Sequence, residues 1–429
     1  MKTTQTERKK HTQHQVSAPG VGIIDFHSLP DGTQIETIPF KAADGVPSRG
    51  VLYTRGNEKT VVCLSHPRAD MSRHYIIPYL LEAGFAAYGH QCRGLNNDVD
   101  CEHEKIVQDL AAGFRHLKSE RGFEKLVLVG NSGGGGLFTF YQEQAGTAPP
   151  GRLTDTAAGE PHDLNAVDMP AADGLVMMAT HPGEGALMLD AIDPSVVDED
   201  DPVSLDPSFD MYDPANGYRE APESSDYSEE FLARYRAGQA ARIARLDAKA
   251  RGWIAQSEFF KAKMADPAFA ELPLAQQHFI RRRAAAGRYM IIYRTEANPA
   301  YCDLSLHAWE STREVGSVAT SDPLRGNYGP GGFARYITPR AWLSSWSISS
   351  RANVLRNLQS IKVPFLMLAY RGDNVCFPDD NRDQVQACPS DDKTMLFIDG
   401  DHYGLPLEER DKGMKMIAAW LRDRFPVAG

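Results

Sequence analysis

Apolar side chains recur with two different spacings along the first part of the chain, and each spacing predicts one kind of secondary-structure element. In residues 33–56, apolar and polar positions alternate around a break of Gly and Pro, which predicts two antiparallel strands joined by a turn. Residues 75–84 and 104–122 space their apolar residues as one face of a helix does. Short apolar runs flank these helices, at 60–67, 84–94, 125–129 and 174–183. This alternation predicts a mostly parallel sheet with helices on both faces.

The alternation of apolar strands and helices stops in the middle of the chain and resumes near its end. Residues 145–174 are rich in Pro, Gly and Asp, which predicts an irregular surface segment. An acidic loop at 193–214 and long helical stretches such as 229–264 follow. From residue 352 onward, a helix, two apolar strands and a last helix resume the earlier alternation.

These patterns divide the chain into a sheet domain and an insert. We expect residues 21–183 and 352–429 to form the sheet domain, and residues 184–351 to form a mainly helical lid inserted before the strand at 363–370. Residues 1–20 are expected to be a disordered tail. They carry positive charges but lack the apolar segment of a secretory signal, so we expect a cytoplasmic protein.

Composition narrows the classes of function. The chain of 429 residues (47.4 kDa) has a net charge of -11 and no dense Lys/Arg block in its body, which disfavours nucleic-acid binding. No apolar run reaches the ~18 residues of a membrane span. The six cysteines lack metal-ligand spacing, so we expect core thiols and neither a metal nor a cofactor. A small-molecule substrate is the expected partner, and homo-oligomerisation is left open.

Residues 130–134, GNSGG, fit the G-x-S-x-G pattern of a nucleophile elbow, between an apolar strand and a helix-compatible segment. A nucleophilic serine such as Ser132 must stand on a sharp turn with its Oγ exposed, and larger neighbours would collide with adjacent backbone. The N–H of Gly133 can then face a developing oxyanion at the start of the next helix. A Walker A phosphate loop would need a Lys that this segment lacks. Gly135 and Gly136 go beyond the motif.

A serine nucleophile needs a base, and the base needs an orienting carboxylate. Asp373 follows one predicted strand and His402 follows the next, and His402 is the only histidine after Asp373. Because Ser132, Asp373 and His402 each come just beyond a parallel strand, we expect all three at one edge of the sheet. The alternative acids are Asp379, Asp380 and Glu184.

The elbow, the ordered acid and histidine, and the loop GHQCRG at 89–94 resemble the α/β-hydrolase family, whose triad runs Ser, Asp, His. The resemblance covers residues 33–183 and 352–425 and implies that fold, a serine hydrolase mechanism and no cofactor. It also implies a second oxyanion donor where the family has His-Gly-x. This chain has His66-Pro67-Arg68 there, so the aligned donor is the backbone N–H of Arg68. The insert matches no family that we can name.

Several side chains are candidates to bind the substrate. Arg68, Arg73 and His74 lie near the expected pocket mouth and could pair with a substrate carboxylate, or they belong to a solvated surface loop. His181, at the end of another strand, is a further candidate or a structural histidine. Four tryptophans of the insert suit an apolar pocket roof or packing within the lid: Trp253, Trp309, Trp342 and Trp346.

Together these features predict a serine hydrolase that cleaves an ester or lactone of a bulky small molecule through an acyl-enzyme, with a substrate carboxylate as an open option. The same triad on this fold also supports hydrolysis of a carbon–carbon bond in a β-diketone, which is the alternative reaction. A non-catalytic binding protein would be expected to have a broken triad, and all three members are present here. The fold alone names no substrate.

Overall fold

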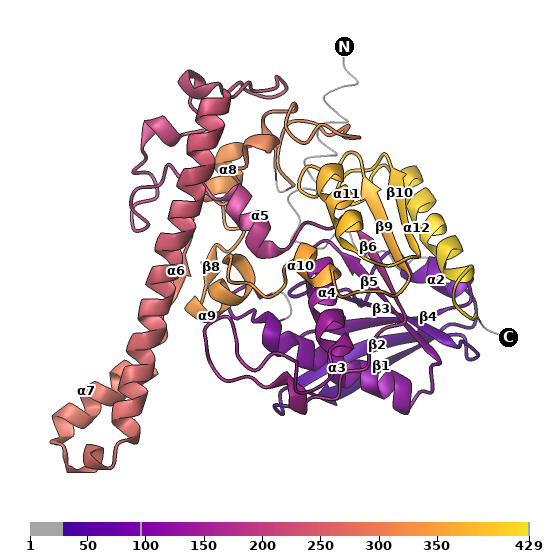
Figure 1. Ribbon diagram of the computed structural model, residues 1–429, viewed down its shortest axis with the longest axis horizontal. Helices are drawn as coiled ribbons and strands as arrows, with labels where there is room; N and C mark the ends of the chain where they lie inside the picture. Colours follow the sequence, from indigo (N-terminus) through magenta and orange to yellow (C-terminus); the bar gives the residue numbers. More distant parts are fainter. Residues whose placement is uncertain (1–28, 95–96, 319, 428–429) are drawn as a thin grey trace.

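The computed structural model describes residues 29–94, 97–318 and 320–427. The expected tail, residues 1–20, lies outside the described residues. Figure 1 shows a sheet flanked by helices, with a long helix running along one side of the molecule.

An eight-stranded sheet forms the centre of the fold, in the order β1-β2-β4-β3-β5-β6-β9-β10. β2 runs antiparallel to both of its neighbours, and from β4 to β10 all neighbouring strands are parallel. The strands are β1 (Gln34–Lys41), β2 (Pro47–Thr54), β3 (Thr60–Ser65), β4 (Ala86–Gln91), β5 (Lys125–Asn131), β6 (Gly174–Met178), β9 (Phe365–Tyr370) and β10 (Lys393–Ile398). The mostly parallel sheet predicted from the sequence is confirmed.

Helices cover both faces of this sheet. Side chains alternate between the faces along each strand, so Cys63 and Leu128 share one apolar layer with α3, α4 and α10, whereas Leu64 and Val129 share the other with α2 and α12. The helices are α2 (Ile77–Glu82), α3 (His103–Ser119), α4 (Gly133–Gly146), α10 (Val354–Leu358), α11 (Pro378–Ala387) and α12 (Leu407–Arg422). Burial on both faces explains why the central strands are continuous apolar runs.

Residues 184–351 contribute a further apolar core. Trp342 and Trp346 pack there with Ile243 and Ile292, and the same core continues into residues 375–377 of the loop after β9. Most described residues between α7 and α8 form loops, so the insert is less regular than the sequence predicts. Its elements are α5 (Glu184–Ala191), α6 (Glu229–Ala265), α7 (Leu274–Ala285), β7 (Met290–Ile291), α8 (Pro323–Tyr328), β8 (Tyr336–Ile337) and α9 (Pro339–Ala341). Short turns of other helix types are η2 (Leu164–Ala166), η3 (Pro207–Phe209), η4 (Pro214–Asn216), η5 (Pro267–Glu271), η6 (Pro299–Tyr301) and η7 (Trp342–Trp346).

The 37-residue helix α6 begins at a side-chain cap, because the N–H of Phe231 donates to Oγ of Ser228 at 3.1 Å. Buried residues recur along α6 from Phe231 to Ile254, and no residue of the helix is buried beyond Ile254. Figure 1 shows this end of α6, with α7 folded back on it, projecting from the body of the molecule. None of the described helices is both long and apolar enough to cross a membrane.

Candidate active site

Ser132 stands on the tight turn between β5 and α4. Its backbone has φ 53° and ψ -126°, a conformation that non-glycine residues rarely adopt. The flanking glycines make the turn possible. A Cβ on Gly130 would lie 2.7 Å from the Cα of Gly135, and one on Gly134 would lie 2.5 Å from the carbonyl oxygen of Ser65. This strand–turn–helix has the form of a nucleophile elbow.

The structure brings Ser132, His402 and Asp373 together. Nε2 of His402 lies 3.2 Å from Oγ of Ser132, and Nδ1 of His402 lies 2.8 Å from Oδ2 of Asp373. The other carboxylate oxygen of Asp373 accepts the N–H groups of Val375 and Cys376 at 2.9 and 3.0 Å. The three residues follow β5, β10 and β9, whose carboxyl ends lie along one edge of the parallel sheet. An imidazole placed between a hydroxyl and a carboxylate can take the hydroxyl proton.

Burial and neighbouring charge shift the pKa of His402 in opposite directions. Burial lowers the pKa of its imidazole, but the charge of Asp373 and the hydrogen bond to it, with a contribution from Asp401, raise that pKa above its ordinary value. Asp373 is fully buried. With Nδ1–H donated to Asp373, the neutral ring presents Nε2 to Ser132 as a proton acceptor.

Two backbone N–H groups are expected to face an oxyanion beside Ser132. Gly133 is the first residue of α4, where helix N–H groups have no partner within the helix. The N–H of Arg68, in contrast, donates to Nδ1 of His66 at 3.2 Å, and the N–H of Ala69 donates to the same atom at 3.0 Å. The expected second donor is therefore engaged by a side chain in this structure.

The side chain of Arg68 is held inside the protein rather than presented to a substrate. Its Nη1 donates to Oε1 of Glu184 at 2.6 Å and its Nε donates to Oδ1 of Asp98 at 3.1 Å. The guanidinium carbon also lies 4.7 Å from the ring centroid of Trp346. Two carboxylates thus compensate the charge of Arg68, so it does not offer a free cation to a substrate carboxylate.

Glu184, one alternative acid, has partners other than His402. Its Oε2 lies 3.1 Å from Nε2 of His103, and its Oε1 bonds to Arg68. Burial raises the pKa of Glu184, but the charges of Arg68 and His103 outweigh burial and lower the pKa to about 2. Glu184 is a permanent carboxylate that neutralises Arg68.

The remaining two alternative acids, Asp379 and Asp380, are also in environments that do not suit an orienting carboxylate. Asp379 pairs with Arg382 at 3.0 Å. Burial, together with the charge of Asp190, raises the pKa of Asp380 to about 8, so this carboxyl is protonated at neutral pH. Within the described part of the chain, Asp373 is the carboxylate hydrogen-bonded to His402.

The structure does not gather the predicted carboxylate-binding side chains at one pocket mouth. Arg73 is exposed, whereas His74 is fully buried and its Nδ1 accepts the N–H of Ile76 at 3.2 Å. Burial, with the charge of Arg410, lowers the pKa of His74 to about 3, so the ring is neutral. The prediction treated these neighbours as one exposed loop, but His74 packs into the core.

Two buried histidines lie close to the elbow region. Nδ1 of His181 accepts the N–H of Gly183 at 3.2 Å, and burial lowers the pKa of His181 to about 4. Nε2 of His66 would lie 2.9 Å from a Cβ on Gly133, and burial lowers the pKa of His66 to about 3. The sequence predicted a role for His181 but none for the His66 ring, although its place directly after a buried strand was an available signal.

Asp373, Cys376 and His402 form a group that could hold a metal ion, because one ligand atom of each lies within 4.8 Å of the others. Asp373 and His402 already bond to each other. Burial and the charge of Asp373 raise the pKa of the Cys376 thiol, which keeps it protonated, and the thiolate is the form that binds metals. The donor set therefore suits a proton-transfer pair better than a metal site.

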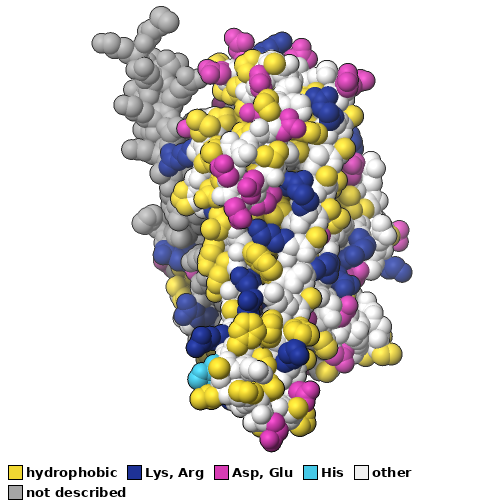
Figure 2. Space-filling view, turned by 90° about the vertical axis from the view of Figure 1, so that its left-hand side faces the viewer, with side chains coloured by type: hydrophobic (Ala, Val, Ile, Leu, Met, Phe, Trp, Pro, Cys, Tyr) yellow, Lys and Arg dark blue, Asp and Glu magenta, His cyan; other side chains and the backbone are white. Residues whose placement is uncertain are grey.

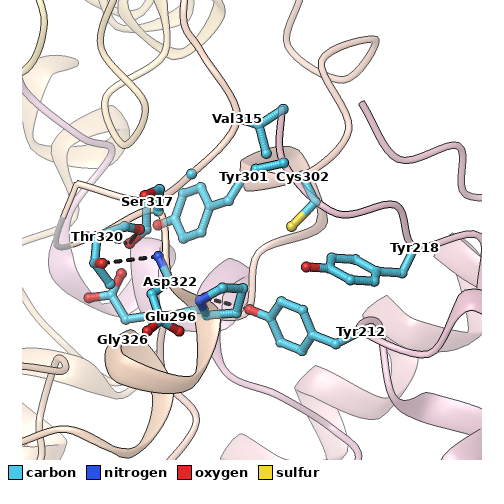
Figure 3. A pocket seen from close by; sticks show the side chains of 14 residues that line it. Tyr212, Tyr218, Glu296, Tyr301, Cys302, Val315, Ser317, Thr320, Asp322 and Gly326 are labelled. Atoms are coloured by element: carbon cyan, nitrogen blue, oxygen red, sulfur yellow. Dashed lines mark hydrogen bonds between the residues drawn. The ribbon is translucent and has the colours of Figure 1, made fainter. Parts of the chain in front are cut away.

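A separate small cavity lies in the insert, lined by Glu296, Tyr301 and Ser317 among others (Figure 3). Its volume of about 20 Å³ is enough for one water-sized particle. Glu296 and Tyr301 are both buried beside this cavity. Burial raises the pKa of Glu296 to about 8, so its carboxyl is protonated at neutral pH.

The strand order, the elbow between β5 and α4, and the order Ser132, Asp373, His402 along the chain occur together. The chain has the α/β-hydrolase fold. No family model and no curated protein sequence matches it.

Among solved structures, the chain is similar to several proteins at low identity. It is similar to the esterase domain of a Rhodothermus marinus protein, with 12% identity, a TM-score of 0.40, and 92% of this chain and 100% of that chain covered. For a thermophilic esterase from Thermogutta terrifontis the identity is 13%, the TM-score 0.41 and the coverage 90% and 98%. For DcsB in complex with its substrate analogue, the identity is 13% and the TM-score is 0.47, and 92% of this chain and 100% of that chain are covered.

Proposed function

We propose that this protein is a serine hydrolase that cleaves a carboxylic ester or lactone through an acyl-enzyme. The observation that carries the proposal is the 3.2 Å separation between Nε2 of His402 and Oγ of Ser132, with Asp373 bonded to the opposite ring nitrogen. This separation is at the limit of hydrogen-bond reach for a general base, and such contacts tighten when substrate binds.

In the first half of the reaction, Oγ of Ser132 attacks the carbonyl carbon while Nε2 of His402 takes its proton. The N–H of Gly133 and the positive end of the α4 dipole stabilise the charge that develops on the carbonyl oxygen. The imidazolium, held by Asp373, then protonates the leaving alkoxide, and the acyl group remains on Ser132.

In the second half, His402 takes a proton from water and the resulting hydroxide attacks the acyl carbon. Ser132 leaves with the proton that His402 returns, and the acid is released. Arg68 remains the proposed second oxyanion donor, but its N–H reaches an oxyanion only after leaving Nδ1 of His66.

The contacts of Arg68 and His74 favour a substrate without a carboxylate. Arg68 is already compensated by Glu184 and Asp98, and His74 is neutral and buried. Pairing a substrate carboxylate with Arg68 would require breaking an existing buried ion pair, which is costly.

The test of the nucleophile is Ser132→Ala. The variant should lose hydrolysis of p-nitrophenyl acetate and labelling by a fluorophosphonate, while its circular dichroism spectrum stays that of the parent protein. Ser360→Ala, at an exposed serine, is the matched control and should keep both activities. Labelling that persists in Ser132→Ala would place the nucleophile elsewhere.

The reaction type needs a second measurement, because cleavage of a carbon–carbon bond in a β-diketone would use the same three residues. A panel of aryl esters, lactones and β-diketones separates the two reactions. We expect turnover of esters or lactones without diketone cleavage. Preferential diketone cleavage that also depends on Ser132 would keep the nucleophile and replace the proposed reaction.

A further inference from the structure

The His66 ring lies between its own loop and the nucleophile elbow. Its Nδ1 accepts the N–H of Arg68 at 3.2 Å and the N–H of Ala69 at 3.0 Å. Pro67 stands between the ring and these two donors along the chain and has no N–H of its own. Within the described part of the chain, both hydrogen bonds of the ring are made by Nδ1, so Nε2 on its far side is not engaged.

The two backbone donors determine which ring nitrogen of His66 carries a proton. A nitrogen that accepts an N–H has no proton of its own, and a neutral imidazole then has its proton on the other nitrogen. Burial, with the charge of Arg68, lowers the pKa of His66 to about 3, so the ring is neutral at neutral pH. Nε2 therefore carries a proton and is a hydrogen-bond donor.

Nε2 of His66 lies next to the residue that follows the nucleophile. A Cβ on Gly133 would lie 2.9 Å from Nε2 and 3.3 Å from Cε1 of this ring, and 3.0 Å from Oε1 of Glu184. The G-x-S-x-G pattern allows any residue after the serine, but here a ring edge and a carboxylate fill the place of a side chain. The N–H and the missing Cβ of Gly133 belong to the same Cα. Nε2 of His66 is therefore close to the N–H that is expected to face the oxyanion.

We propose that the Nε2–H of His66 is the second hydrogen-bond donor to the oxyanion, in place of the backbone N–H of Arg68. This inference rests on the proposed serine hydrolase mechanism and replaces only that one donor. His66 donates a hydrogen bond and keeps its proton, so the bonds that form and break in the reaction stay the same. Histidine side chains are among the groups that form oxyanion holes, and a donor fixed before the reaction needs no rearrangement.

The contacts of Arg68 favour the ring over its own N–H as the donor. That N–H would have to leave Nδ1 of His66 before it could reach the oxyanion. The side chain of Arg68 is bonded to Glu184 and Asp98, so the loop is held by its side chain as well as by its backbone. Arg68 also compensates the charge of Glu184, the carboxylate beside Gly133, which would otherwise oppose a developing negative charge.

Two substitutions separate the donor from the loop contacts of His66. In His66→Asn, Oδ1 can accept the backbone N–H groups that Nδ1 accepts, but no atom reaches the position of Nε2. This variant should lose about 10²–10³-fold in kcat for p-nitrophenyl acetate with little change in KM, because the donor acts on charge that develops only during the attack. In His66→Gln, the amide NH₂ can reach the position of Nε2, but the acceptor for the loop is lost. This variant should keep kcat within about tenfold of the parent protein and have a lower melting temperature.

The matched control is His278→Asn, at an exposed position of α7, the helix at the lower end of the surface in Figure 2. It should change neither kcat nor the melting temperature. Full kcat in His66→Asn, or a greater loss of kcat in His66→Gln than in His66→Asn, overturns the inference and leaves the ring only a role in holding the loop. These outcomes remove only the donor as long as Ser132→Ala is inactive. Activity that survives Ser132→Ala overturns the proposed function itself.

A second measurement examines the ring directly. In ¹⁵N-labelled protein at pH 7, the histidine signals that disappear in His66→Gln should belong to a ring with an unprotonated Nδ1 and a protonated Nε2. A trifluoromethyl ketone forms a tetrahedral adduct with a serine and places an oxyanion in the site, so it should shift the Nε2–H proton downfield. His66→Asn should weaken inhibition by this ketone by about the factor that it loses in kcat/KM. A proton on Nδ1, or inhibition that is unchanged in His66→Asn, contradicts the inference.

Discussion

Ser132 has an unfavourable backbone conformation at the position of the proposed nucleophile. A non-glycine residue with such a positive φ costs of order 1–3 kcal/mol. Two hydrogen bonds hold it there: its N–H donates to the carbonyl of Met178 on β6 at 3.1 Å, and its carbonyl accepts the N–H of Gly135 at 3.1 Å. Because the neighbouring strand and helix fix this residue, Oγ stays within reach of His402 before a substrate arrives, which removes an ordering step from the reaction.

Replacing the orienting carboxylate should lower turnover and change its pH dependence. Asp373→Asn is expected to lose about 10⁴-fold in kcat, the scale of loss when this member of a triad is removed. His402 must be neutral to act as a base, and the charge of Asp373 raises its pKa. Activity of the parent protein should therefore fall as pH drops below a midpoint that lies above the ordinary pKa of histidine. The acid limb of the residual activity should move to lower pH in the variant.

Two control variants test which carboxylate orients His402. Asp379→Asn removes a partner of Arg382 and should be nearly silent. Glu184→Gln leaves Arg68 with one carboxylate fewer, so it should lower the melting temperature more than it changes the pH profile. An active Asp373→Asn beside an inactive but folded Glu184→Gln would move the orienting role to Glu184.

Glu296 should make the protein less stable as pH rises. Burial raises the pKa of Glu296 from 4.5 to about 8, so the folded state retains a proton that the unfolded state has lost in this interval. Stability therefore falls through the interval, by at most about 1.4 kcal/mol per pH unit. Glu296→Gln has no proton to lose, so its free energy of unfolding relative to the parent protein should rise from pH 5 to pH 8. Urea unfolding at the two pH values measures this difference.

The control for this prediction is an acid without burial. Glu82→Gln, at an exposed position, should show no such trend. Equal pH dependence of the parent protein and Glu296→Gln would mean that the carboxyl is ionised when buried, with a partner that compensates it.

At the level of elements, α4 begins with four glycines that are not equivalent. A Cβ on Gly135 would lie 2.5 Å from Cγ2 of Thr180, whereas a Cβ on Gly136 has its nearest atom at 3.7 Å. Gly135→Ala should therefore destabilise the packing of α4 on the sheet. Gly136→Ala should be neutral or stabilise the protein by about 0.5–1 kcal/mol, because alanine favours a helix. Urea unfolding of the two variants, with esterase activity as a second readout, compares them directly.

The sequence was sufficient for the elements that bring the triad together because each is a local pattern. β9 is apolar throughout, and β5 and β10 each contain a run of four apolar residues. Parallel strands place their carboxyl ends at the same edge of the sheet. The surroundings of Arg68 could not be predicted in this way. Its partners Asp98 and Glu184 lie 30 and 116 residues away along the chain, and only the folded structure brings them together.

The sequence also could not predict whether a single polar side chain points into the core or into solvent. His74 lies in a polar stretch that favours exposure, yet its ring is fully buried. The partner of the Arg68 backbone N–H could not be predicted either, because its hydrogen bond to the His66 ring depends on the backbone torsions of one short loop. Local pattern fixes where a loop begins and ends but not which polar group inside it pairs with which.

At the scale of the whole molecule, the insert should be separable only at its tip. Arg288 donates to Oε1 of Gln256 at 3.3 Å, so a short Gly/Ser linker can replace residues 257–287. This deletion should leave kcat near that of the parent protein, because no residue of α6 beyond Ile254 is buried. Replacing all of 184–351 should instead give no soluble folded protein, because the insert shares its core with residues 375–377 beside Asp373. A folded, active product of the larger deletion would show that the sheet domain is independent.

The position of the insert also affects how the protein is made. β6 pairs with β5 on one side and with β9 on the other, so its second edge stays open until β9 emerges from the ribosome. Roughly 190 residues separate the two strands, which takes about 10–40 s at roughly 5–20 residues per second. During that time the nascent chain carries an apolar strand with unpaired N–H and C=O groups, a template for pairing with other chains. Slower translation, or fewer chaperones, should therefore reduce the yield of soluble protein more than the final stability suggests.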